Sequence, residues 1–138
     1  LYSFVTSRRV SEENAKKIDA WIKSLDVGFY SVEYSWRKGE HPKQGSFNPD
    51  LFIKIRRDIL VVEIKADTDI SSENKAKLRY ARQHFDRLNE LQSEYKYYFK
   101  FLSPSSYDLF FQNLREGKHK AFKSNIEAKL DDLDRASL

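Results

Sequence analysis

The chain has 138 residues, the size of one domain, and its 40% hydrophobic and 33% charged residues are typical of a folded globular protein. No apolar run approaches the roughly 18–20 residues that cross a bilayer, so we expect no transmembrane segment. The absence of cysteine excludes disulfides, thiolate zinc sites and cysteine nucleophiles, and it fits a cytoplasmic location. The net charge of +4 favours a polyanion as partner.

Residues 1–138 show no internal repeat, no low-complexity tract and no linker rich in proline or glycine. We therefore expect a single domain. The chain contains no methionine and begins at Leu1, which favours a fragment of a larger protein with further domains.

The first predicted element is an amphipathic helix over residues 11–25. Ser11 is a suitable N-cap, and Glu12 and Glu13 follow in the first turn, where the helix dipole favours acidic side chains. Gly28 is expected to end the helix. The apolar residues at helical spacing are Ala15, Ile18, Ile22 and Leu25.

Residues 29–36 alternate in a way that predicts a strand with one aromatic-rich face. The next segment, 37–46, contains Gly39, Pro42 and Gly45, so we expect a loop. The residues on the aromatic-rich face of the strand are Tyr30, Val32, Tyr34 and Trp36.

Two runs rich in β-branched residues, 51–55 and 59–64, predict a hairpin with its turn at 56–58. Apolar residues at helical spacing then predict a helix over 72–92, and the aromatic-rich segment 95–102 predicts a further strand with its rings in the core.

Two more helices are expected near the C-terminus. Pro104 suits a first helical turn, Gly117 suits a helix end, and a last helix is predicted over 119–133. The expected order is α-β-β-β-α-β-α-α, an α/β fold with a mixed sheet flanked by helices.

Three ionisable residues are predicted to converge on one face of the hairpin. An antiparallel pairing with its turn at 56–58 places Asp50 opposite Glu63, and the period of two along a strand places Glu63 and Lys65 on the same face. Glu63 lies within an apolar run, where an unpaired carboxylate is costly by several kcal/mol. A divalent cation between the two carboxylates relieves that cost, and Mg²⁺ is the natural choice because it takes oxygen ligands.

The sequence Pro49-Asp50 followed by Glu63-Ile64-Lys65 resembles the PD-(D/E)XK motif of nucleases with a restriction-endonuclease-like fold. The resemblance implies that Asp50 and Glu63 bind Mg²⁺ (or Mn²⁺ in its place) and that the Ile64 carbonyl contributes a further ligand. It also implies that Lys65 assists the attacking water. The expected activity is hydrolysis of phosphodiester bonds, with DNA as the substrate, by an endonuclease module of a restriction or repair protein.

The resemblance covers residues 11–102 and leaves 104–133 as a helical C-terminal extension. The predicted helix over 72–92 also resembles, more loosely, nuclease domains of type III-like restriction or helicase proteins, which implies a helicase or translocase among the missing domains. A double-strand cut needs two sites, which a homodimer would supply. The residues that carry this looser resemblance are Lys77, Leu78, Tyr80, Ala81, His84, Phe85, Leu88 and Asn89.

Several polar residues around this core are further candidates. Some members of the nuclease family add an acid from the first helix, and Glu12 is better placed than Glu13 to be that ligand, although capping explains both. Lys77 and Tyr80 flank the apolar stripe of their helix and are candidates for phosphate contacts. His84, on the same flank, is a weaker candidate, because a half-buried hydrogen-bonded histidine is the more frequent case.

The predicted loop carries Arg37, Lys38, His41 and Lys43, and it is as well explained by contact with a DNA backbone as by an ordinary solvated loop. Two alternatives to the nuclease remain. One is a catalytically inactive nucleic-acid-binding or protein-interaction domain on the same fold. The other is an Asp at a strand start with an unrelated Glu–Lys pair on an edge strand. No zinc-binding helix motif, Gly-x-Ser-x-Gly elbow or Walker-type loop is present.

Overall fold

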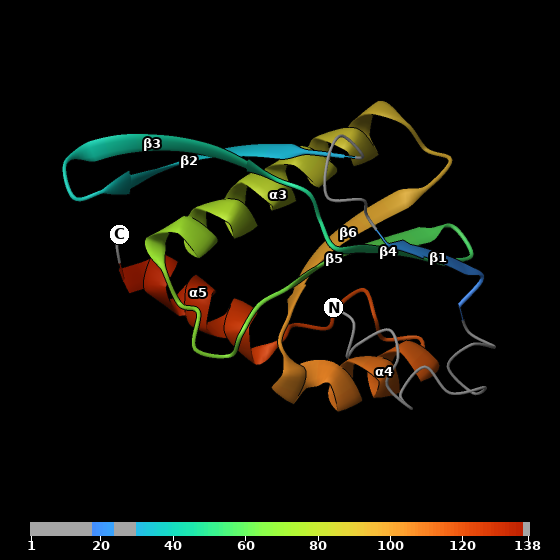
Figure 1. The fold of residues 1–138 in the computed structure, drawn as a ribbon. Helices are drawn as coiled ribbons and strands as arrows, with labels where there is room; N and C mark the ends of the chain where they lie inside the picture. The colour runs from blue at the N-terminus through green and yellow to red at the C-terminus, as the bar shows by residue number, and fades with distance from the viewer. Residues whose placement is uncertain (1–17, 24–29, 137–138) are drawn as a thin grey trace.

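A mixed four-stranded sheet forms the centre of the fold (Figure 1). The computed structural model describes residues 18–23 and 30–136. The strand order is β1-β4-β5-β6, with antiparallel pairing of β1 to β4 and of β4 to β5, and parallel pairing of β5 to β6. These strands span Ala20–Lys23 (β1), Leu51–Ile55 (β4), Asp58–Ile64 (β5) and Lys96–Leu102 (β6).

A separate antiparallel hairpin, β2 (Val32–Lys38) and β3 (His41–Phe47), lies beside helix α3 (Ser72–Leu91) (Figure 1). The predicted loop over 37–46 is therefore wrong, because most of it is strand. Gly39 adopts a φ of +66° in the tight turn, which suits glycine. Gly45 pairs with Tyr34, and a Cβ there would lie 2.7 Å from the tyrosine hydroxyl oxygen, so this glycine allows an aromatic ring to cover the strand.

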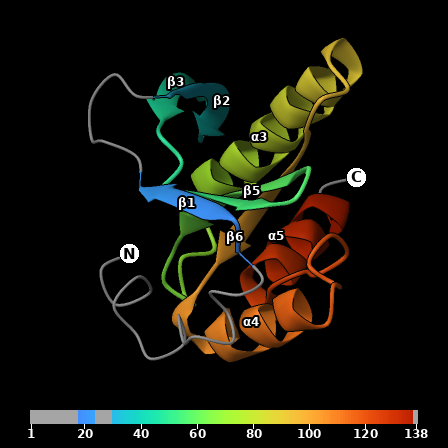
Figure 2. The same cartoon turned by 90° about the vertical axis from the view of Figure 1, so that its right-hand side faces the viewer.

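Helices cover both faces of the sheet (Figure 2). Helix α3 begins after Ser71, whose side chain accepts a hydrogen bond from the Asn74 amide, as an N-cap does. It packs on one face, whereas α4 (Tyr107–Arg115) packs on the other after a 3-10 turn at Pro104–Ser106. The last helix, α5 (Asn125–Ala136), contacts β6 and α3. None of the helices in the described part of the chain is long and apolar enough to cross a membrane.

Alternation along β5 divides the core into two apolar clusters. Leu60 and Val62 point into the cluster beneath the sheet with α4, and Val61 points into the cluster shared with α3 and the β2–β3 hairpin. Glu63 follows Val62, so the period of two turns its side chain to the α3 side.

The predicted mixed α/β class is confirmed, but two further element predictions are wrong. Within the expected helix over 11–25, residues 20–23 form strand β1, because pairing with β4 satisfies backbone groups that the edge of β4 would otherwise expose. Residues 11–17 and 24–29 lie outside the described residues. The last helix begins at Asn125 and not at 119, since the carbonyl oxygens of Lys120 and Phe122 accept hydrogen bonds from the buried Lys100 ammonium.

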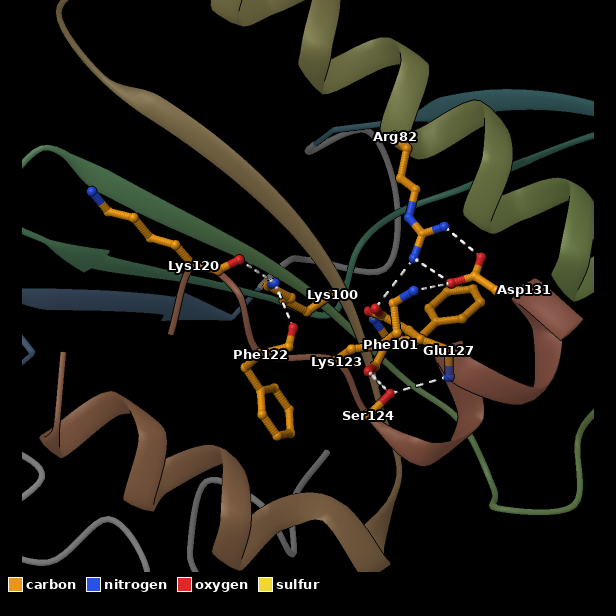
Figure 3. Close-up of polar contacts among 9 residues, drawn as sticks. All are labelled: Arg82, Lys100, Phe101, Lys120, Phe122, Lys123, Ser124, Glu127 and Asp131. Atoms are coloured by element: carbon orange, nitrogen blue, oxygen red, sulfur yellow. Dashed lines mark hydrogen bonds and ion pairs between the residues drawn. The ribbon is translucent and has the colours of Figure 1, made fainter. Parts of the chain in front are cut away.

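The outer edge of β6 is closed by side chains of the α5 region (Figure 3). The Phe101 amide donates to the Glu127 carboxylate at 2.6 Å, and the Ser124 hydroxyl donates to the Phe101 carbonyl oxygen at 2.6 Å. Arg82 of α3 lies 3.3 Å from Glu127 and 2.7 Å from Asp131. A buried carboxylate thus takes the place of a neighbouring strand, which protects an edge that would otherwise be open to pairing with another chain.

Glu127→Ala is expected to lower the free energy of unfolding by about 3–5 kcal/mol, because it leaves the Phe101 amide unpaired and removes the anion facing Arg82. Asp131→Ala is the matched control. It removes a more exposed partner of the same arginine and is expected to cost about 1 kcal/mol or less. Urea unfolding measures both, and equal losses would contradict the edge-closing role of Glu127.

Candidate functional site

The β4–β5 hairpin places two carboxylates opposite each other at one end of the sheet. Leu51 pairs with Val62, so the next position outward places Asp50 opposite Glu63. The Asp50 carboxylate accepts a hydrogen bond of 2.8 Å from the Ile64 amide, which holds it across the strand. The predicted juxtaposition is confirmed, whereas the ligand roles stay a prediction.

Glu63 is a buried acid with only 5% of its surface exposed. The pKa of its carboxyl is raised to about 9, first by burial and then by the hydrogen bond and the charge of the neighbouring Asp50. Lys65, whose ammonium lies 3.9 Å from the Glu63 carboxylate, and Lys77 act in the opposite direction. Glu63 therefore keeps its proton at neutral pH in the absence of a further cation.

Helix α3 brings Lys77 to the same place. Its ammonium lies 5.4 Å from the ring centre of Tyr34 and 5.5 Å from that of Phe47, so it approaches Glu63 between aromatic rings. Burial lowers the pKa of Lys77, and the nearby charge of Lys65 lowers it further. The structure thus joins Asp50, Glu63, Lys65 and Lys77 in one group.

Tyr34 and Glu73 form a wall of this site that the sequence analysis missed. The Tyr34 hydroxyl donates to the Glu73 carboxylate at 2.6 Å. Burial and this acidic partner raise the pKa of Tyr34. Two signals point to the pair: Tyr34 shares the buried face of its strand with Val32, and Glu73 precedes Lys77 by one helical turn.

Tyr80 and His84 lie elsewhere. Tyr80 lines a hollow against the β2–β3 hairpin together with Tyr34 and Gly45, and within the described part of the chain it forms no hydrogen bond with Asp50, Glu63 or Lys65. His84 is hydrogen-bonded to the Tyr30 hydroxyl and packs edge-on against that ring, which is the hydrogen-bonded role expected of a half-buried histidine. Glu12 lies outside the described residues.

The acidic pair fits a divalent cation with oxygen ligands. Residues 18–23 and 30–136 contain no group of three or more His, Cys, Asp or Glu side chains that could hold a metal ion. The site therefore offers two carboxylates, those of Asp50 and Glu63. This number suits Mg²⁺, since the ion usually keeps several waters and binds through one or two carboxylates together with substrate phosphate. The raised pKa of Glu63 supports the fit, because a cation supplies the charge that favours its ionised form.

No protein-family profile matches the chain, and comparisons with curated proteins and with solved structures find no significant match. The motif, the hairpin register and the site chemistry are therefore the grounds for a functional proposal.

The free energy of unfolding of the metal-free protein is expected to fall as the pH rises from about 5 to about 9. The ordinary pKa of a glutamate is 4.5 and that of Glu63 is about 9, so over this range the native state holds a proton that the unfolded chain has lost. One such proton changes the stability by at most about 1.4 kcal/mol per pH unit. Glu63→Gln removes this contribution.

Urea unfolding in EDTA at several pH values measures the difference between the parent and Glu63→Gln, which is expected to change steadily with pH. Glu116→Gln is the control, because Glu116 is exposed and the pKa of its carboxyl is lowered, not raised, by the side chains of Gln112 and Lys118. A difference that does not change with pH for Glu63→Gln would show that Glu63 is ionised in the native protein.

Proposed function

We propose that this chain is a metal-dependent nuclease of the PD-(D/E)XK type that hydrolyses phosphodiester bonds in DNA. The observation that carries the proposal is the buried Glu63 carboxyl, which faces Asp50 and is approached by the ammonium groups of Lys65 and Lys77. A buried carboxyl that faces a second, half-buried acid is unfavourable as a purely structural feature, and it becomes favourable when a metal and an anionic substrate complete the charge balance.

Asp50 and Glu63 would hold Mg²⁺, with the Ile64 carbonyl as a further oxygen donor. When bound, the ion supplies a water of lowered pKa and stabilises negative charge on the phosphate. Lys65 lies beside Glu63 and would orient that water, while Lys77 would contact the phosphate oxygens from α3. Tyr34, which donates a hydrogen bond to Glu73, would line the site beside Lys77.

Loss of the Glu63 proton is expected to accompany metal binding. At pH 7, calorimetric titration with Mg²⁺ or Mn²⁺ in buffers of different ionisation enthalpy should show about one proton released per ion, and the apparent affinity should rise about tenfold per pH unit below the Glu63 pKa. Asp50→Asn is expected to abolish binding. Binding without proton release would exclude Glu63 as a ligand.

Cleavage of a plasmid is expected to require Mg²⁺. Asp50→Ala should abolish it together with metal binding, and Lys65→Ala should slow it by roughly 10²–10⁴-fold, the range usual for groups that assist proton transfer. Lys77→Ala should also slow it. Lys118→Ala is the matched control, since this lysine is exposed, pairs with Glu116 and should leave the rate unchanged. Folded Asp50→Ala and Lys65→Ala proteins that cut as fast as the parent would overturn the proposal.

The alternative is a nucleic-acid-binding or protein-interaction domain on the same fold without turnover. The observation that favours it is a groove lined by Arg37, Lys43, Lys75 and Arg79. Cationic side chains can bind a nucleic acid without a metal ion. DNA binding without metal-dependent cleavage by the parent protein would favour this alternative. A helicase or translocase domain in the same polypeptide, a homodimer and a cytoplasmic location stay predictions.

A further inference from the structure

We propose that a groove between the β2–β3 hairpin and α3 binds the phosphate backbone of a nucleic acid. The groove has a volume of about 550 Å³ and is open to solvent along the hairpin. This inference deepens the proposed nuclease function, on which it rests, by assigning a path for the substrate outside the metal site. Its lining residues are Ser35, Trp36, Arg37, Pro42, Lys43, Gln44, Ser72, Lys75, Ala76 and Arg79.

The groove is lined by four cationic side chains and no acidic one. Arg37 and Lys43 come from the hairpin, and Lys75 and Arg79 come from the facing side of α3, so positive charge lies on both walls. Neither Arg37 nor Lys43 forms an ion pair with a described residue, and the Arg79 guanidinium lies 5.3 Å from the ring centre of Tyr80. Cations that line one groove repel one another, and a polyanion in the groove reduces that repulsion.

The side chains that line the groove favour a phosphate backbone over an acidic peptide. Arginine presents a planar fork that binds phosphate oxygens in pairs, and the Gln44 amide and the Ser35 and Ser72 hydroxyls add neutral donors. Trp36 is half-buried at the groove, which places an aromatic ring beside the cations, a combination that suits a nucleic acid because sugars and bases also contact the ring.

The groove also leads to the candidate site. The Trp36 ring stacks on the Tyr34 ring with 5.2 Å between ring centres. The Lys77 ammonium lies 5.4 Å from the centre of the same Tyr34 ring. One aromatic pair therefore separates the groove from the group around Glu63. Helix α3 serves both places, since Lys75 and Arg79 line the groove and Lys77 lies near Lys65 and Glu63.

The test is binding of a fluorescent DNA duplex in EDTA, where no metal-dependent cutting occurs, at several salt concentrations. Arg37→Ser/Lys43→Ser is expected to weaken binding by about one to two orders of magnitude at 0.1 M salt and to reduce the slope of log K against log salt by about two. Both side chains are exposed, so the fold should be unaffected, which circular dichroism checks.

The matched control is Arg57→Ser/Lys118→Ser, which removes the same charges from the far turn of the β4–β5 hairpin and from the segment after α4. It is expected to weaken binding less than threefold. Three outcomes would each overturn the proposal. The two double variants could weaken binding equally, the parent could show no salt-dependent binding, or polyglutamate could displace the duplex as readily as unlabelled DNA does.

Fluorescence of Trp36 gives a local readout in a Trp21→Phe protein, because the chain has only two tryptophans. The duplex is expected to change the emission of Trp36, and unchanged emission at saturating DNA would contradict the groove assignment. The two proposals can fail separately. If the groove variant weakens DNA binding but the parent protein does not cut DNA with Mg²⁺, only the nuclease proposal is overturned. If the parent protein cuts DNA but Arg37→Ser/Lys43→Ser leaves its DNA affinity unchanged, only the groove proposal is overturned.

Discussion

The arrangement of the site depends on one constraint, the burial of an acidic side chain at the end of an interior strand. β5 is paired on both sides, by β4 and β6, and its residues Leu60 to Val62 are fully enclosed. Glu63 continues this strand and cannot move to solvent without breaking the pairing with β6. Its carboxyl must therefore be neutral or be met by positive charge, and Asp50 opposite it increases that demand.

A second buried glutamate shows how the same fold accommodates an acid that has only a structural role. Glu127 accepts a hydrogen bond of 2.6 Å from the Phe101 amide and lies 3.3 Å from Arg82 (Figure 3). Among the described residues the one cation paired with Glu63 is the Lys65 ammonium, at 3.9 Å, and Glu63 also faces a second acid, Asp50. This contrast favours a ligand, and not the protein alone, as the partner of Glu63.

Helix α3 connects the two surfaces that the proposals concern. Its apolar residues, Leu78 and Phe85 among them, are buried against the sheet and the hairpin, which fixes the rotation of the helix. That rotation directs Lys77 to the acid pair and Lys75 and Arg79 to the basic groove. The proposed binding groove and the candidate catalytic site thus share one helix, which holds their relative positions constant.

The sequence by itself determined the strands of the β4–β5 hairpin, helix α3, strand β6 and the approach of Asp50 to Glu63, because each follows from local periodicity and from the register that a short turn imposes. Only the tertiary structure decided that residues 20–23 pair with β4, that β3 is a strand despite Gly39, Pro42 and Gly45, and that Lys77 and not Tyr80 reaches the acids. The physical reason is that these features arise from contacts between segments distant in the chain, which local sequence patterns do not reveal. The contacts are the pairing at the sheet edge, the covering of Gly45 by Tyr34 and the packing that fixes the rotation of α3.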